Sequence, residues 1–267
     1  MTKGSCSSNK AKIARRVVEV LEYFDDQHSE ATVMDIVRRY DRPQSSTSEL
    51  LSSLVELGIL HKDPHSRSYS PTARAALLGS AGQPDMIRDG RMVRLMERLV
   101  AQTGLDVALF SMVGLDTQVV NARSGKRSMY NDKEQLFGGT KETLAFNAQG
   151  CLLLSTVEKT RREGMVRRMN AEAEESCKFS HKEIMERIDA CVERRYVVGP
   201  AGYGTDRKIL AALMPRQPDN HPLAIGILYR AEDKVVPENL LRCLGDAMRK
   251  CLPDPESANV EQFPHAA

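Results

Sequence analysis

Short polar side chains gather on one side of the segment 43–57, which is predicted to be helical. A helical wheel places the following residues on its apolar side: Thr47, Leu50, Leu51, Leu54 and Leu57. The opposite side and the N-terminal end carry Gln44, Ser45, Ser46, Ser48, Glu49, Ser52 and Glu56. An amide can pair with adenine, a carboxylate can accept from the amino group of cytosine, and a hydroxyl can bond a base or a phosphate. The segment therefore predicts a surface that could read base edges.

Basic side chains lie close to this helix in the sequence. They are Arg38 and Arg39 before it, and His61, Lys62, His65, Arg67 and Arg74 after it. The whole chain of 267 residues has a net charge of only +2. A DNA-binding protein needs a local basic surface rather than a basic chain. We therefore expect Arg38, Arg39, Lys62, His65 and Arg67 to face the sugar-phosphate backbone.

The elements around this segment predict a winged helix-turn-helix at residues 10–80, after a loose tail at 1–9. Apolar residues at helical spacing predict helices at 11–26 and 33–40, and Thr32 with Asp35 forms a plausible capping pair. Pro43 suits the first position of the third helix and Gly58 suits its C-terminal cap. Strands at 59–63 and 67–70 flank a turn at 64–66. This order of elements is typical of a winged helix-turn-helix.

The rest of the chain predicts a second domain of a different class. Ser80–Pro84 resembles a hinge, and a connecting helix is expected at 85–102 within a linking segment 81–103. Four strands are predicted at 105–112, 117–121, 208–214 and 223–230, and four helices at 145–156, 158–170, 181–195 and 237–251. Strands and helices mixed in this way favour an α+β domain at 104–252 with an antiparallel sheet flanked by helices. Residues 253–267 are expected to form a loose tail.

Several classes of protein are not supported by the sequence. There is no apolar run long enough for a membrane span and no signal peptide, so we expect a cytoplasmic protein with no membrane partner. The six cysteines include no Cys-x-x-Cys pair, and no metal or cofactor is expected. No nucleophile with a base and no paired carboxylates stand out, so an enzyme is not predicted.

The chain resembles the IclR family of bacterial transcriptional regulators in several segments. In the first domain the resemblance runs through ATVMDIVRRYDRPQSSTSELLSSLVELGILHKDPHSRSYSPTARAALLG. The segments of the second domain that resemble the family, in the same order, are TGLDVALFSMVGLDTQVVNARSG, GGTKETLAFNAQGCLLLST, ERRYVVGPAGYGTDRKILAALMP and PLAIGILYR. The resemblance covers about 240 residues.

This resemblance implies a GAF-like effector domain, with a cup that holds a small organic ligand, often a carboxylate. It also implies operator binding by homodimers or dimers of dimers, and control of catabolic genes by repression or activation. The positions that would line the cup are Leu144, Asn147, Ala148, Gly199, Ile209, Gly226 and Leu228. The family often has acidic, Cys or Ser side chains at some of these positions. The cup is therefore either enlarged and apolar, suited to a bulkier ligand such as an aromatic one, or filled as ordinary core.

Glu49 stands where the family commonly has Arg, which changes the expected operator preference. An alternative function is a winged-helix module that binds protein instead of DNA, because a fold does not settle function. For the regulator, we hypothesise that ligand closure of the second domain moves the helix at 85–102 and changes the spacing of the two reading helices.

Overall fold

The computed structural model describes residues 9–25, 28–78, 85–126, 136–215 and 222–252. The chain divides into two compact units between Arg88 and Asp89. Each unit is described by itself. The expected tails and the expected hinge at 80–84 fall outside the described residues, apart from Asn9.

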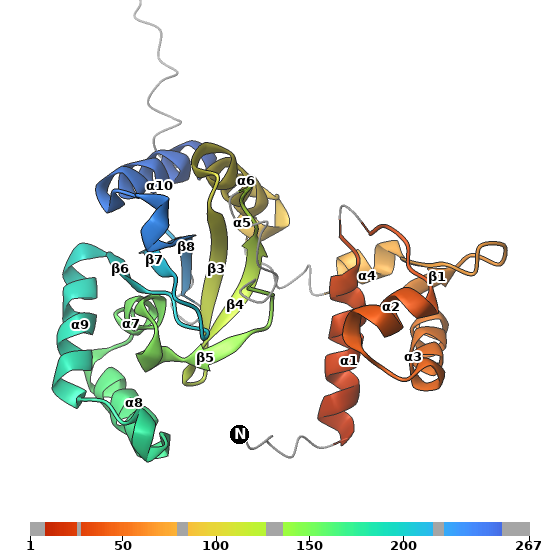
Figure 1. Ribbon diagram of the computed structural model, residues 1–267, viewed down its shortest axis with the longest axis horizontal. Coiled ribbons are helices and arrows are strands. Elements are labelled where there is room, and N and C mark those ends of the chain that lie inside the picture. Colours follow the sequence, from red (N-terminus) through yellow and green to blue (C-terminus); the bar gives the residue numbers. More distant parts are fainter. Residues whose placement is uncertain (1–8, 26–27, 79–84, 127–135, 216–221, 253–267) are drawn as a thin grey trace, which may run out of the picture. The chain divides into compact units, whose positions relative to one another are not determined.

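The first unit consists of helices and a two-stranded hairpin (Figure 1). Its elements are α1 Asn9–Tyr23, α2 Val33–Tyr40, α3 Gln44–Glu56, β1 Leu60–Lys62, β2 Tyr69–Pro71 and α4 Ala73–Leu77, with α5 Asp85–Arg88 at its end. The first three helices enclose an apolar core that includes Val20, Ile36, Leu51 and Leu54. The predicted capping box at Thr32 and Asp35 is confirmed.

Three details of the first unit differ from the sequence-based expectation. Pro43 is the N-cap of α3 rather than its first helical residue, with an extended ψ of 137°. The second strand begins at Tyr69, because Asp63 to Ser68 form the turn and Arg67 has a left-handed φ of 57°. Helix α4 was not expected at all.

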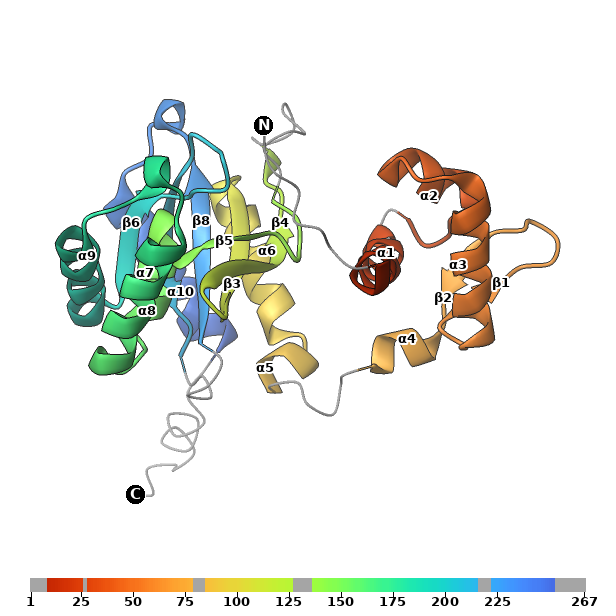
Figure 2. The same ribbon diagram turned by 90° about the horizontal axis from the view of Figure 1, so that it is seen from below.

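The second unit is built on a six-stranded antiparallel sheet with the order β5-β4-β3-β8-β7-β6. The strands are β3 Asp106–Val113, β4 Asp116–Arg123, β5 Lys141–Thr143, β6 Tyr196–Pro200, β7 Lys208–Leu213 and β8 Leu223–Tyr229. Helices α7 Ala148–Leu154, α8 Lys159–Glu172 and α9 His181–Arg194 lie on one side of the sheet. Helices α6 Arg91–Thr103 and α10 Pro237–Cys251 pack together on the other side (Figure 2). Short 3₁₀ helices occur at Leu144–Phe146, Glu175–Cys177 and Ala231–Asp233.

This arrangement confirms the predicted α+β class and the four predicted strands, but it adds two edge strands that were not predicted, β5 and β6. The single helix expected at 85–102 is wrong. Gly90, with a left-handed φ of 73°, separates α5 from α6. A left-handed residue cannot continue a right-handed helix, and glycine adopts this conformation at little cost.

Helix α7 lies at the centre of the second unit's core. All seven of its residues are buried, and the apolar ones pack against the sheet and α9. The predicted helix 145–156 is in fact a 3₁₀ turn followed by α7, because Asn147 has an extended backbone and caps α7 with its side chain.

Candidate functional site

The exposed side of α3 carries most of the polar residues predicted to read bases. Gln44, Ser45, Glu49 and Ser52 are exposed, Ser46 and Ser48 are half-buried, and Thr47, Leu51 and Leu54 face the core. Leu57 is an exception, because it is the C-cap of α3 and is 63% exposed rather than inward. The first two turns of the helix therefore present amide, hydroxyl and carboxylate groups to solvent.

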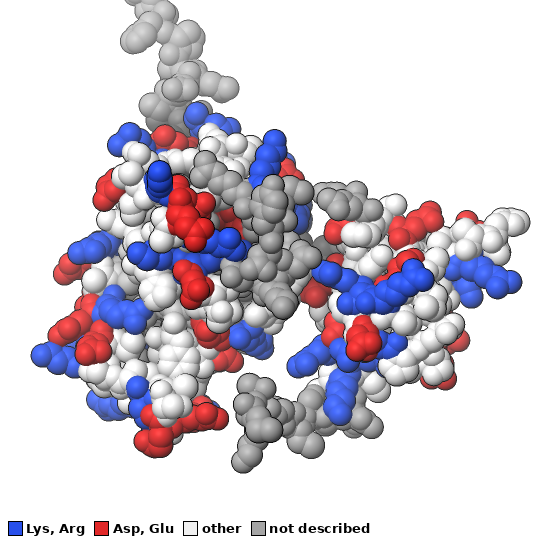
Figure 3. Space-filling model, viewed as in Figure 1, with Lys and Arg blue, Asp and Glu red and all other residues white. Residues whose placement is uncertain are grey.

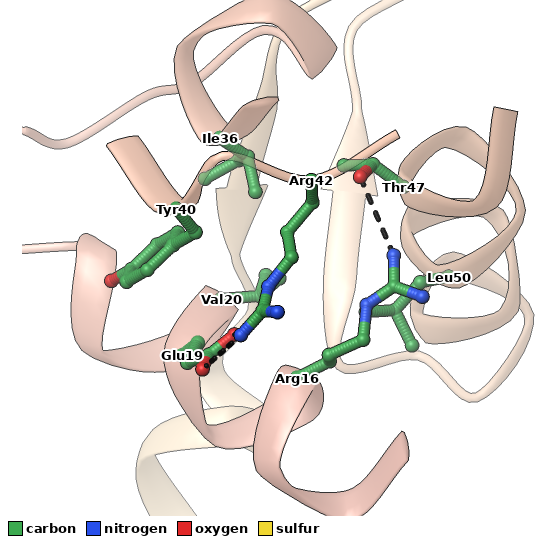
Figure 4. Close-up of a pocket in the computed structure, with 8 residues that line it drawn as sticks. All are labelled: Arg16, Glu19, Val20, Ile36, Tyr40, Arg42, Thr47 and Leu50. Atoms are coloured by element: carbon green, nitrogen blue, oxygen red, sulfur yellow. Dashed lines mark hydrogen bonds and ion pairs between the residues drawn. The ribbon is translucent and has the colours of Figure 1, made fainter. Parts of the chain in front are cut away.

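Arg16 of α1 anchors the start of α3, and the sequence analysis missed it. Its Nη2 donates to Ser46 Oγ at 3.2 Å. It also donates to Thr47 Oγ1 at 3.4 Å (Figure 4). Thr47 Oγ1 in turn donates to the Pro43 carbonyl oxygen at 2.9 Å. The first turn of α3 is thus tied to α1 by a cationic side chain. No local pattern could have predicted this, since Arg16 and Ser46 are 30 residues apart.

A second arginine lines the same shallow hollow between α1, α2 and α3. Arg42 Nη2 donates to Glu19 Oε1 at 2.9 Å, so its charge is largely balanced by Glu19. Arg42 therefore joins the end of α2 to α1, whereas Arg16 reaches α3.

The hairpin forms a wing whose tip carries the expected basic residues. Lys62, His65 and Arg67 are all exposed, and Lys62 Nζ lies 5.4 Å from the centre of the Tyr69 ring. The Asp63 carboxylate accepts from the backbone N–H groups of His65 and Ser66, and these bonds hold its pKa below the usual range. The Asp63 carboxylate thus stabilises the turn of the wing.

Arg38 and Arg39 are exposed at the C-terminal end of α2. Figure 3 shows Lys and Arg side chains gathered on one face of the first unit, over α1 and α2 and again beside the hairpin. The basic surface therefore extends beyond the residues expected from the sequence, because α1 contributes to it.

In the second unit, the residues expected to line a cup lie in the core between the sheet and α7. Asn147 is fully buried and its Oδ1 accepts from Gly150 N at 2.7 Å and from Thr117 Oγ1 at 3.1 Å. Its Nδ2 donates to Glu142 Oε2 at 2.8 Å. Leu144, Ala148, Ile209 and Leu228 belong to one buried apolar cluster.

The space expected beside the two glycines is occupied by neighbouring side chains. A Cβ added to Gly226 would lie 2.4 Å from Cδ1 of Ile209, and one added to Gly199 would lie 2.9 Å from Cβ of Ala148. The missing side chains thus allow Ile209 and Ala148 to pack closely against the sheet. In this structure, neighbouring side chains therefore lie beside both glycines.

A loop that was not predicted to matter covers the same region. Between β6 and β7, Gly202 and Tyr203 adopt left-handed φ values of 78° and 57°. Tyr203 packs against the buried cluster, and its backbone N–H donates to Glu142 Oε1 at 2.7 Å. Within the described residues no helix is long and apolar enough to cross a membrane, and no cluster of metal-ligating side chains occurs there.

The geometry defines a two-unit protein with a winged helix-turn-helix and an α+β unit built on a six-stranded antiparallel sheet. The model of the IclR helix-turn-helix domain matches residues 14–64. These residues form an IclR helix-turn-helix domain, and the chain has the fold of IclR-family transcriptional regulators.

Several solved structures of IclR proteins share the fold of this chain. An IclR homologue from Microbacterium hydrocarbonoxydans, crystallised with 4-hydroxybenzoate, is 18% identical over 92% of this chain and 99% of its own, with a TM-score of 0.59. An IclR transcriptional regulator from Alicyclobacillus acidocaldarius is 17% identical over 90% and 96%, with a TM-score of 0.56. The Thermotoga maritima IclR is 14% identical over 91% and 96%, with a TM-score of 0.55. No match was found among curated protein sequences.

Proposed function

We propose that this chain is a ligand-responsive transcriptional regulator that binds operator DNA as a homodimer or a dimer of dimers. The observation that carries the proposal is the IclR helix-turn-helix domain, whose third helix exposes Gln44, Ser45 and Glu49 at its N-terminal end. In helix-turn-helix proteins this end of the second helix of the motif enters the major groove.

The contacts divide into two kinds. On α3, Gln44, Ser45, Ser48, Glu49 and Ser52 would contact bases or nearby phosphates, and Ser46 would keep the first turn bound to Arg16. The phosphate contacts would come from Arg38, Arg39, Lys62, His65 and Arg67. Because Glu49 repels phosphate, we expect it to lie over a base, where a carboxylate can accept from cytosine.

The second unit would sense a small organic molecule, and the regulated genes would be catabolic. The Microbacterium hydrocarbonoxydans relative supports this proposal, because its crystals contain 4-hydroxybenzoate. We propose that the ligand binds beside the start of α7, near Leu144, Asn147, Ala148, Gly199, Ile209, Gly226 and Leu228. Because side chains now fill this region, ligand entry requires some of them to move.

The decisive experiment is a DNA-shift assay with genomic fragments, repeated over a series of salt concentrations. We expect selective retention of a few fragments, with an affinity that falls steeply as salt rises, because each neutralised phosphate releases a counterion. If no fragment is retained selectively, or if binding ignores salt, the protein-binding alternative replaces the DNA-binding proposal.

A further inference from the structure

The loop between β6 and β7 spans the sheet from one edge to the other. It leaves β6, which is one edge strand, yet Tyr203 N donates to Glu142 of β5, which is the opposite edge strand. Figure 1 shows this connection reaching the region where β4 and β5 meet. The loop therefore crosses the same side of the sheet as α7 and closes over the start of that helix.

The phenol ring of Tyr203 points inward, where its hydroxyl and its aromatic face both make contacts, as those of a bound ligand would. Its hydroxyl donates to the Thr117 carbonyl oxygen at 3.1 Å. Its ring stacks on Phe110 with a centroid distance of 6.3 Å and an interplanar angle of 20°. Burial raises the pKa of the hydroxyl above its usual value, so the neutral phenol is the form held there.

A buried amide beside the phenol has unused hydrogen-bonding capacity. Gln149 is fully buried, and its Nε2 donates to the Ala201 carbonyl oxygen at 2.7 Å. Its Oε1 is buried and has no hydrogen-bond partner among the described residues. A buried acceptor without a partner is costly, and a polar ligand could satisfy it.

The loop holds Tyr203 in these contacts with a strained backbone. Tyr203 has a left-handed φ of 57°, a conformation that L residues other than glycine avoid. At Gly202 a Cβ would lie 2.0 Å from Oε2 of Glu142, so only glycine permits the close approach. The Tyr203 contacts must therefore outweigh the backbone strain for the loop to stay in place.

The carboxylate that holds the loop also holds the start of α7. Glu142 accepts from Tyr203 N with Oε1 and from Asn147 Nδ2 with Oε2, and Asn147 caps α7 by accepting from Gly150 N. Release of the loop would leave one oxygen of this bridge without its partner. The position of the loop and the cap of the helix are thus linked through a single side chain.

We propose that Tyr203 is a built-in occupant of the effector cup, and that the effector is a phenol that takes its place and releases the loop. The proposal deepens the proposed function, because it names the ligand class of the same site. The contacts of Tyr203 define the class: an aromatic ring to stack on Phe110 and a hydroxyl to donate to Thr117. Displacement of the loop then changes the Glu142 bridge to α7.

The test uses p-cresol, which reproduces the tyrosine side chain. In the full-length Tyr203→Gly variant the left-handed backbone is retained, because glycine favours it, while a space of the size of p-cresol is opened. Calorimetric titration should show p-cresol binding to this variant at least tenfold more tightly than to the original chain. Toluene, which lacks the hydroxyl, should bind the variant about tenfold more weakly than p-cresol, as expected for the loss of one hydrogen bond.

Two further variants keep the test decisive. Tyr203→Phe retains the ring and should bind p-cresol no better than the original chain. Glu142→Gln keeps the shape of the side chain but removes one acceptor oxygen of the bridge, so it should loosen the loop and raise p-cresol affinity severalfold. If Tyr203→Gly does not fold, as judged by circular dichroism, Glu142→Gln decides the matter.

The proposal would be overturned if p-cresol bound the folded Tyr203→Gly and Glu142→Gln variants no better than the original chain, or if toluene bound Tyr203→Gly as tightly as p-cresol. These titrations contain no DNA. A failure here is therefore distinct from a failure of the proposed regulatory function, which the DNA-shift assay tests.

Discussion

Two exposed side chains of the first unit, Gln44 and Arg67, differ in what each can contact on DNA. Gln44 begins α3, where an amide can reach base edges, whereas Arg67 lies on the wing turn, where it can reach phosphates. Base contacts decide which sequence is bound, and phosphate contacts decide how strongly any sequence is bound.

The Arg67→Asn substitution should weaken binding to all DNA sequences to a similar degree. Asparagine is chosen because it tolerates the left-handed φ of 57° at this position, so the turn is preserved. The slope of log affinity against log salt should fall by about one unit, the loss of one phosphate contact. DNA-shift titrations at several salt concentrations measure this slope, with Arg161→Ala on the exposed side of α8 as the matched loss of one charge. An unchanged slope would remove Arg67 from the interface.

Gln44→Ala should instead alter the preferred sequence while leaving the salt slope unchanged. A bidentate amide–adenine pair discriminates between bases by about 1–3 kcal/mol, so affinity for the original operator should fall while affinity for variants at one base pair is retained. The matched control is Ser53→Ala, because Ser53 is exposed on the same helix but its hydroxyl donates to the Glu49 carbonyl oxygen. Selection from a randomised operator library would show the change. If both variants keep the original preference, α3 does not read bases through Gln44.

At the scale of elements, two glycines show how the backbone sets the helix boundaries. Gly90 separates α5 from α6 with a φ of 73°, whereas Gly164 lies inside α8 and a Cβ there would meet no atom within 4 Å. Gly90→Ala should lower the free energy of unfolding by about 1–2 kcal/mol, because alanine is strained in the left-handed region. Gly164→Ala should raise it by about 0.5–1 kcal/mol, because alanine is the better helix former. Urea denaturation of both variants measures the difference, and stabilisation by Gly90→Ala would show that the break is not required.

Local patterns predicted the elements that have a strong apolar period. The wheel of α3, the capping box at Thr32 and the central strands β3, β7 and β8 all follow from spacing or from buried runs. The edge strands escaped prediction because β5 is a three-residue segment, Lys-Glu-Thr, with no buried residue, and β6 is only partly buried. Short, polar edges lack the alternation that identifies a strand.

The candidate sites were predicted unevenly for a related reason. The exposed polar side of α3 belongs to a single helix, so the spacing of polar and apolar residues within that helix is enough to predict it. The contacts of Arg16 with Ser46 and of Glu142 with Tyr203 join residues 30 and 61 positions apart, and they exist only after folding. The close packing of Ile209 beside Gly226 likewise exists only after folding, and no spacing in the sequence predicts it.

At the scale of the whole molecule, regulation requires that the two units affect each other's binding equilibria. An effector of the second unit should change operator affinity of the full-length chain by about 5- to 150-fold, the usual range of allosteric coupling. By linkage, operator DNA must change effector affinity by the same factor. Paired titrations, each with and without the other ligand, check this equality. If a bound effector leaves operator affinity and the footprint unchanged, the second unit does not control the first in the way proposed.

The pairing of β3 with β8 has a consequence for the order in which the chain can fold during synthesis. The buried residues of the first unit's core lie between Val20 and Tyr69, with Ala75 packed against them, so its contacts join residues within one short stretch of the chain. The centre of the sheet, by contrast, joins Asp106 to Leu228, so it cannot close until β8 has left the ribosome. Contacts between distant residues form slowly, and domains made first generally fold first. The helix-turn-helix can therefore be folded on a nascent chain whose sheet is still open, with β3 and α7 awaiting the last strand.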